Sequence, residues 1–210
     1  MLDFNVRNEL QKQFSVESSS VLLDIKRGDK NFYSSAVAIS GSMLLTSAHS
    51  VDCLDTGIAI ADGIKIEIEH VYIHPSYNPQ SSFFDHDIAV IKLKKRLPFG
   101  IVPAIIGKDD FVVPGPYQRI GYGERNGHNF KFVSNIKFLS RTFNQRNLLF
   151  IDSTSVNGDS GGPIYKMTEK GLKLIAIHST LENDNKIYTV NLSEYRSWID
   201  SKIEEFLLVS

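Results

Sequence analysis

Residues 157–163 read Asn157-Gly158-Asp159-Ser160-Gly161-Gly162-Pro163, a serine enclosed by glycines. Because glycine adopts positive φ angles without steric cost, this run predicts a tight turn that presents the serine hydroxyl. A serine hydroxyl is a poor nucleophile at neutral pH unless a base accepts its proton and donors stabilise the oxyanion that forms. In such a turn the amides of Gly158 and Ser160 can point into one small space and serve as an oxyanion hole. The same letters also fit an ordinary loop, so the assignment depends on finding a base.

A candidate base and a candidate acid lie upstream of this turn. In residues 44–49 an apolar run ends in two small residues and His49, which places this histidine at or just after the end of a predicted strand. Asp87 directly precedes residues 88–93, whose alternating β-branched pattern predicts another strand. An aspartate in that place can be buried and accept a hydrogen bond from an imidazole. Each residue alone would more often be structural, but the order His49, Asp87, Ser160 is a known chain order of a Ser-His-Asp triad.

With these motifs the chain resembles the chymotrypsin/trypsin-like serine proteases. The resemblance extends from about Val21 to Leu207 and rests on residues 46–49, 87–93 and 158–163, with weaker matches at 74–78, 121–123 and 195–199. It implies an all-β fold of two six-stranded antiparallel β-barrels with a C-terminal α-helix. The implied division is barrel one at about 21–100, a crossover near 97–116, barrel two at about 117–192 and the helix at about 193–207. Residues 1–20 are left as an N-terminal segment and a candidate pro-peptide.

The local patterns agree with an all-β fold. From Val21 onwards, short apolar runs alternate with turn residues, which is typical of a barrel or sandwich. Examples of the expected strands are residues 34–39, 43–47, 64–70, 88–93, 118–122, 131–138, 148–152, 162–165, 172–178 and 186–190. Only residues 193–207 predict a helix, with Ser193 as its N-cap and Arg196 and Asp200 on the solvent side. Its apolar stripe comprises Tyr195, Trp198, Ile199, Ile203 and Phe206.

The resemblance implies peptide-bond hydrolysis through an acyl-enzyme, with protein or peptide substrates and no cofactor. In this mechanism Ser160 attacks the carbonyl, His49 transfers the proton, and Asp87 orients and stabilises the imidazole. One alternative is a non-catalytic binding module on the same fold, although such modules usually lose a triad member. A serine esterase is another alternative. The Gly-x-Ser-x-Gly elbow of the α/β-hydrolases does not fit, because in that fold the histidine comes last in the chain.

Specificity residues are also carried over from the family. The primary pocket would be formed by Thr154, Ser155, His178 and Thr180. Because Thr154 stands where an acid would bind Arg or Lys, a basic preference is not expected. A histidine with hydroxyl groups resembles the glutamate-specific branch, since a protonated imidazole and hydroxyl donors can bind a carboxylate. Alternatively, His178 is only a strand residue and Thr180 narrows the pocket for small apolar side chains.

Asp159 has an expected structural role. In the family, the acid before the nucleophile pairs with a newly cut apolar N-terminus. Cleavage after Glu9 would expose Leu10 at about the required spacing. A lysine or backbone amides are the alternative partners.

Charge and composition exclude several functional classes. The net charge of −1 gives no electrostatic reason to expect nucleic acid or an anionic membrane as a partner. No apolar run reaches the about 18 residues of a transmembrane helix, so no membrane partner is expected. The protein is also expected to be a monomer. No metal site is expected either. Glu67 and Glu69 alternate in a strand pattern and are expected to face solvent rather than bind a cation. His86 lies next to Asp87, but Asp87 is expected to serve the triad and not a metal.

Cysteine use points to a disulfide-free member of the family. Cys53 is the only cysteine, so no intrachain disulfide can form, and it is expected to be a small apolar filler. Ser50 and Val156 stand where relatives usually carry cysteines. Disulfide-poor relatives are mostly bacterial, which suggests a bacterial source. Residues 1–13 lack the apolar region of a signal peptide; a secreted or periplasmic protease whose signal has been removed is the expected setting.

Overall fold

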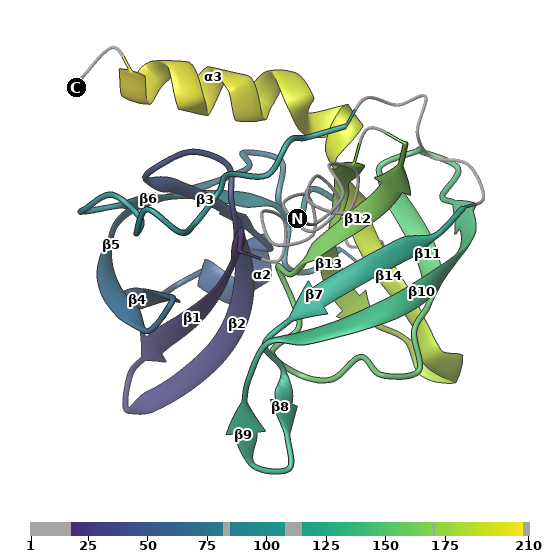
Figure 1. Cartoon of the computed structure of the whole chain (residues 1–210), viewed down its shortest axis with the longest axis horizontal. Coiled ribbons are helices and arrows are strands. Elements are labelled where there is room, and N and C mark those ends of the chain that lie inside the picture. Colours follow the sequence, from purple (N-terminus) through teal and green to yellow (C-terminus); the bar gives the residue numbers. More distant parts are fainter. Residues whose placement is uncertain (1–17, 82–84, 108–114, 170, 208–210) are drawn as a thin grey trace, which may run out of the picture.

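The computed structural model describes residues 18–81, 85–107, 115–169 and 171–207. Two closed, six-stranded antiparallel barrels lie side by side, and a C-terminal helix lies along one side of the pair (Figure 1). This architecture confirms the predicted all-β class.

The first barrel is built from the N-terminal half of the chain. In pairing order its strands are β1 (Ser20–Arg27), β2 (Lys30–Ala38), β3 (Met43–Thr46), β6 (Ala89–Leu93), β5 (Ile64–Ile73) and β4 (Thr56–Ala61). Alternate residues point inward, so Val21, Leu23 and Ile25 of β1 are completely buried in the barrel core. The short helix α2 (Ala48–Val51) directly follows β3 and carries His49.

The second barrel is built from the C-terminal half. In pairing order its strands are β10 (Phe132–Arg141), β11 (Asn147–Ile151), β14 (Lys186–Asn191), β13 (Gly171–Leu181), β12 (Pro163–Thr168) and β7 (Tyr117–Gly121). Its core contains Tyr117 and Phe150, whose rings meet edge to face at 5.2 Å. A 3₁₀ turn, η2 (Asn183–Asn185), separates β13 from β14.

A small hairpin projects from the second barrel toward the bottom of Figure 1. It pairs β8 (Glu124–Arg125) with β9 (His128–Asn129). Its two turn residues, Asn126 and Gly127, have φ angles of 54° and 78°. An Asn-Gly pair is favoured there because both central residues of a type I′ turn need positive φ.

A third apolar cluster joins the two barrels. It combines residues such as Val37 and Val90 from the first barrel with Ile120 and Ile177 from the second. The C-terminal helix α3 (Arg196–Leu207) covers this cluster with its predicted apolar stripe and lies along the first barrel in Figure 1. Contacts between barrels therefore set the relative positions of groups that come from opposite halves of the chain.

Two local expectations were wrong. Ser193 is not at the start of α3, because it lies within a preceding 3₁₀ turn, η3 (Leu192–Tyr195), and α3 begins at Arg196. Cys53 is exposed rather than an apolar filler, since it follows α2 at a positive-φ position (55°) on the surface. The expectation for Ser193 was based on the residue preference of helix N-caps, and that for Cys53 on the usual burial of free cysteine.

Candidate active site

His49 and Asp87 form a tightly bonded pair at the edge of the first barrel. His49 Nδ1 lies 2.8 Å from Asp87 Oδ2, and the backbone amide of His49 donates to Asp87 Oδ1 at 2.9 Å. The carboxylate side chain is 3% exposed, whereas the imidazole is 42% exposed. Burial alone would raise the pKa of Asp87, but the hydrogen bonds and charge of His49 and the Ser179 hydroxyl lower it. The aspartate is therefore an anion that orients an accessible imidazole.

Ser179 connects this pair to Ser160. Its hydroxyl donates to Asp87 Oδ2 at 2.5 Å, and its carbonyl oxygen accepts a hydrogen bond from Ser160 Oγ at 3.1 Å. The pairing register of β13 and β14 shifts between His178 and Thr180, so Ser179 is the extra residue of a β-bulge. Among the described residues, the Ser160 hydroxyl donates to this carbonyl and makes no hydrogen bond to His49.

The loop around Ser160 leaves two backbone donors unused. Gly158 and Gly161 have φ angles of 94° and 78°, as the glycine-rich turn predicts. The Gly161 amide donates to the His178 carbonyl at 2.7 Å. Within the described part of the chain, the amides of Gly158 and Ser160 have no acceptor. Two free amides flanking a serine hydroxyl are the donor set that an oxyanion needs.

Contacts with β2 hold this loop against the first barrel. The Ser160 carbonyl accepts from the Ser35 amide and the Ser34 hydroxyl, each at 2.8 Å. Ser35 Oγ donates to the Gly158 carbonyl at 2.8 Å. These bonds cross from one barrel to the other beside the site, so they set the distance between Ser160 and His49.

The turn that carries His49 is held without a disulfide. Arg27 Nη2 donates to the carbonyls of His49 and Ser50 at 2.8 and 2.7 Å. Ser50 Oγ lies 2.7 Å from Ser34 Oγ and 2.6 Å from Ser47 Oγ. A buried set of hydroxyl groups thus occupies the place where the family usually carries a cysteine after the histidine.

The predicted structural acid, Asp159, is fully buried and paired with arginines. Its Oδ2 lies 2.9 Å from Arg119 Nη1 and 2.7 Å from Arg125 Nη2. Burial raises the pKa of Asp159, but the Arg119 charge and the bond from Arg125 lower it overall. The sequence offered a lysine or backbone amides as partners of Asp159. The backbone amides of Gly123 and Val156 do donate to it, but its cationic partners are arginines and not a lysine. Glu9 and Leu10 lie outside the described residues.

The four predicted pocket residues separate into one bonded pair and two single residues. Ser155 Oγ and His178 Nε2 are 3.0 Å apart and buried, whereas Thr180 is partly exposed. The Thr154 hydroxyl donates to Asp152 Oδ1 at 2.6 Å and accepts from Arg119 Nη2 at 3.3 Å. Thr154 is therefore tied into the buried arginine network, and Ser155 and His178 form a second, directly bonded unit.

His178 is uncharged in the free chain. Burial, followed by the charge of Arg119, lowers the pKa of His178 to about 3. Its Nδ1 atom is buried and has no hydrogen-bond partner among the described residues.

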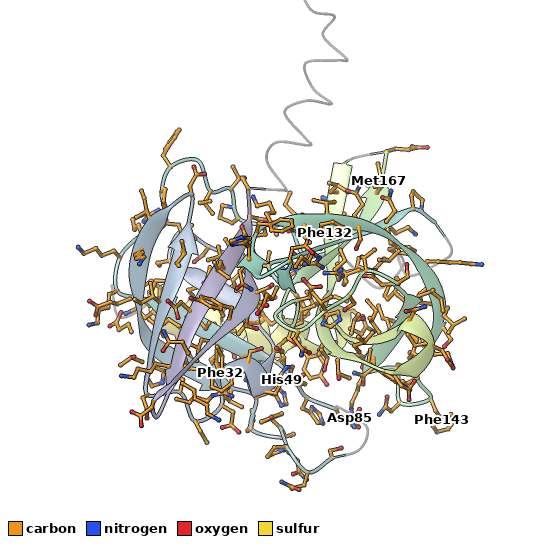
Figure 2. The ribbon with its side chains drawn as sticks, turned by 90° about the horizontal axis from the view of Figure 1, so that it is seen from below. Phe32, His49, Asp85, Phe132, Phe143 and Met167 are labelled. Atoms are coloured by element: carbon orange, nitrogen blue, oxygen red, sulfur yellow. The ribbon has the colours of Figure 1, made fainter. Side chains whose placement is uncertain are left out.

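A hollow lies beside the imidazole of His49, and Ser160, Ser155 and His178 are not among the residues that border it. A cavity of about 190 Å³ is bordered by His49, Asp87, Tyr77 and Thr180. Figure 2 shows His49 in the lower part of the view, between the labelled Phe32 and Asp85.

No described helix has the length and apolar character needed to span a bilayer. The described residues also contain no cluster of three or more His, Cys, Asp or Glu side chains placed to hold a metal ion.

Sequence reasoning assigned no role to several residues of this site. Ser179 was only part of the strand beside the pocket, and its position after a histidine gave no sign of the bulge. Arg119 and Arg125 flank the Gly-Tyr-Gly turn at residues 121–123, but no sequence pattern links them to Asp159. Their roles depend on contacts between distant segments.

Comparisons with known proteins agree with this architecture. The family model described as Trypsin matches residues 11–199. The chain is 25% identical over 232 residues to CLIP domain-containing serine protease B10 of Anopheles gambiae, a match that covers 85% of this chain and 63% of that protein. It is 24% identical to Serine protease 7 of Drosophila melanogaster (73% of this chain, 46% of that protein) and 27% identical to Phenoloxidase-activating enzyme of Bombyx mori (75% and 43%). The chain thus spans less than two thirds of the length of these relatives.

Proposed function

The chain belongs to the trypsin family, and we propose that it is a serine endopeptidase that hydrolyses peptide bonds through an acyl-enzyme. The observation that carries this proposal is the buried Asp87 carboxylate bonded to His49 Nδ1, with two unused amides beside the Ser160 hydroxyl.

In the proposed reaction, Ser160 Oγ forms a bond to the scissile carbonyl carbon while His49 Nε2 accepts the hydroxyl proton. The carbonyl electrons move to an oxyanion bound by the amides of Gly158 and Ser160. His49 then gives the proton to the departing amine as the C–N bond breaks, which leaves an acyl-enzyme ester on Ser160. Water hydrolyses this ester, with His49 first accepting the water proton and then returning a proton to Ser160 Oγ. Asp87 remains ionised and stabilises the imidazolium.

Ser160 must leave its present partner for this reaction. Its hydroxyl donates to the Ser179 carbonyl in the free chain. The proposed reaction requires this hydroxyl to turn from that acceptor to the imidazole of His49. Catalytic hydrogen bonds in ligand-free proteins are often long or misaligned and tighten only when substrate binds. The present bond is therefore compatible with a resting site.

A serine-directed fluorophosphonate tests the proposed nucleophile. We expect the wild-type chain to be labelled at Ser160, and Ser160→Ala to lose the label. Ser201→Ala, which removes a hydroxyl from the distant helix α3, is the matched control and should label like wild type. A wild-type chain that remains unlabelled would instead support the alternative of a non-catalytic binding module. Comparing matched peptide and ester substrates separates a peptidase from an esterase.

For the primary pocket we propose a preference for Glu or Asp before the scissile bond. The buried Ser155–His178 pair supports this preference, because a hydroxyl and an imidazole can both donate to a carboxylate. Asp152, two residues before Thr154, is not free to bind a basic side chain, since its carboxylate is bonded to Arg119 and Thr154. The alternative is a preference for small apolar residues in a pocket narrowed by Thr180.

The low pKa of His178 makes the acidic preference testable by pH. An incoming carboxylate would favour the imidazolium, so binding of a Glu substrate should be coupled to proton uptake. We expect kcat/KM for a Glu peptide to rise relative to its Gln analogue as pH falls from 8 to about 5.5. Peptides with Ala, Phe and Arg complete the series. A Glu peptide cleaved no better than the Ala peptide would favour the small-residue alternative.

We further propose that the protein acts as a monomer outside the cytosol on protein or peptide substrates, without nucleic-acid or membrane partners. Light scattering after size-exclusion chromatography tests the monomer, and a dimer mass would refute it. The bacterial source stays a prediction, as do the export route and a pro-peptide role for residues 1–20.

A further inference from the structure

The acceptor capacity of Asp159 is fully used by groups within the chain. Oδ1 accepts from the Gly123 amide at 2.9 Å and from Arg125 Nη1 at 3.3 Å. Oδ2 accepts from the Val156 amide at 3.0 Å and from Arg125 Nη2 at 2.7 Å. A carboxylate offers about four lone-pair positions. Arg119 Nη1 lies 2.9 Å from Oδ2 as an ion pair without hydrogen-bond geometry. An additional ammonium would therefore have to displace one of the four donors or this guanidinium.

The charges around Asp159 are already balanced. Arg119, whose side chain is completely buried, pairs with both Asp159 and Asp152, and Arg125 adds a second cation at Asp159. Two guanidinium groups thus face two carboxylates. Burying a further positive charge without a free anion is unfavourable.

Arg125 is held in place by bonds that do not involve Asp159. It donates to the carbonyls of Gly123 at 3.0 Å and Thr154 at 2.9 Å, and its guanidinium carbon lies 4.2 Å from the centre of the Phe132 ring. The type I′ turn at Asn126 and Gly127 fixes the hairpin that carries it. This arginine is therefore preorganised next to the loop that contains Gly158 and Ser160.

We propose that Arg119 and Arg125 are positioning residues that hold Asp159, and through it the Gly158 and Ser160 amides, so that activity requires no newly cut N-terminus. This inference rests on the proposed endopeptidase function. It assigns to two internal guanidinium groups the role that a freed Leu10 amine would otherwise have. The chain would then be competent as soon as it folds.

The first experiment asks which N-terminus the active species carries. A full chain beginning at Met1 and a chain beginning at Leu10 are reacted with fluorophosphonate, and the labelled species are weighed by intact mass spectrometry. We expect both to label at rates within about twofold, with Met1 still present in the longer one. Labelling confined to chains that begin at Leu10 would overturn the inference but leave the endopeptidase proposal intact. Labelling of neither chain would refute both.

Alkaline pH separates an arginine from an amine. An α-amino group titrates near pH 8 and somewhat higher when paired, whereas a guanidinium stays charged above pH 12. We expect kcat of the full chain to stay level from pH 8 to about 10. A loss of kcat over this range that is abolished by acetylating the N-terminal amine would contradict the inference.

Substitution of Arg125 tests the positioning role directly. Because both oxyanion donors depend on the same loop, Arg125→Gln should lower kcat at least about 100-fold, with a smaller change in KM. Arg125→Lys keeps a positive charge and should recover at least tenfold of that loss. Arg196→Gln, which breaks an exposed pair with Asp200, is the matched control and should keep kcat. Arg125→Gln that is folded and fully active would overturn the inference. If that variant does not fold, the N-terminal and alkaline measurements still decide.

Discussion

Gly161 lies where the nucleophile loop presses against the first barrel, so adding one methyl group there should displace the two halves of the site. A Cβ at this position would lie 2.1 Å from Thr46 Oγ1, 2.2 Å from the Ser35 carbonyl oxygen and 3.0 Å from the Ser47 amide nitrogen. An ordinary contact begins at 3.4 Å. Because Ser35 contributes backbone and not a flexible side chain, the strand and the loop must separate by about 1 Å.

Two costs of Gly161→Ala can be distinguished. The φ angle of 78° strains any L-residue by about 1–2 kcal/mol, which should lower the free energy of unfolding. The separation of the barrels is expected to act mainly on catalysis, because a misplacement of about 1 Å can cost about 100-fold in rate. We therefore expect kcat/KM to fall at least about 100-fold while the protein remains folded.

Gly63→Ala is the matched control for this prediction. Gly63 has a φ angle of 77° and no atom within 4 Å of its added Cβ, so it reports the strain without the displacement. Thermal unfolding and peptide hydrolysis are measured for both variants, with active sites counted by fluorophosphonate. Both should lose similar stability, but Gly63→Ala should keep kcat/KM within about twofold. Equal activity of the two variants would refute the idea that this contact sets the geometry between the barrels.

Other perturbations test the charged and hydroxyl groups near the site. Burial raises the pKa values of Asp152 and Asp159, but neighbouring arginines lower them overall; their stabilisation is thus present above about pH 4 and lost as pH falls through the folded values. Calorimetry from pH 7 to 3 should show a falling Tm, and a constant Tm would contradict this assignment. Ser179→Ala removes the hydroxyl bonded to Asp87 and should lower kcat about 10-fold with little change in KM, whereas a threonine at this position should restore kcat if the hydroxyl is what matters. Arg27→Met removes two hydrogen bonds to the turn that carries the proposed base; we expect about 1–3 kcal/mol less stability and a lower kcat, and unchanged stability would argue against a positioning role.

Patterns confined to a few neighbouring residues predicted the elements well. The alternation in residues 88–93 predicted β6, and the glycines around Ser160 predicted the positive φ angles seen at Gly158 and Gly161. The apolar stripe of the C-terminal helix was also correct, although Ser193 was wrongly placed as its cap. Such features depend on backbone preferences and side-chain periodicity, which are properties of short segments.

The partners of the polar groups were decided by the tertiary structure. The sequence placed Asp159 beside Ser160 but did not identify Arg119 and Arg125, which approach it from another strand and a hairpin. Likewise, only the bulge in β13 brings Ser179 between Asp87 and Ser160. The backbone conformation near Ser160 is set by local sterics, so the residue types of this short segment are enough to predict it. A buried charge must instead be neutralised by whichever donors the packed chain brings within about 3 Å, and that choice exists only once both barrels have formed.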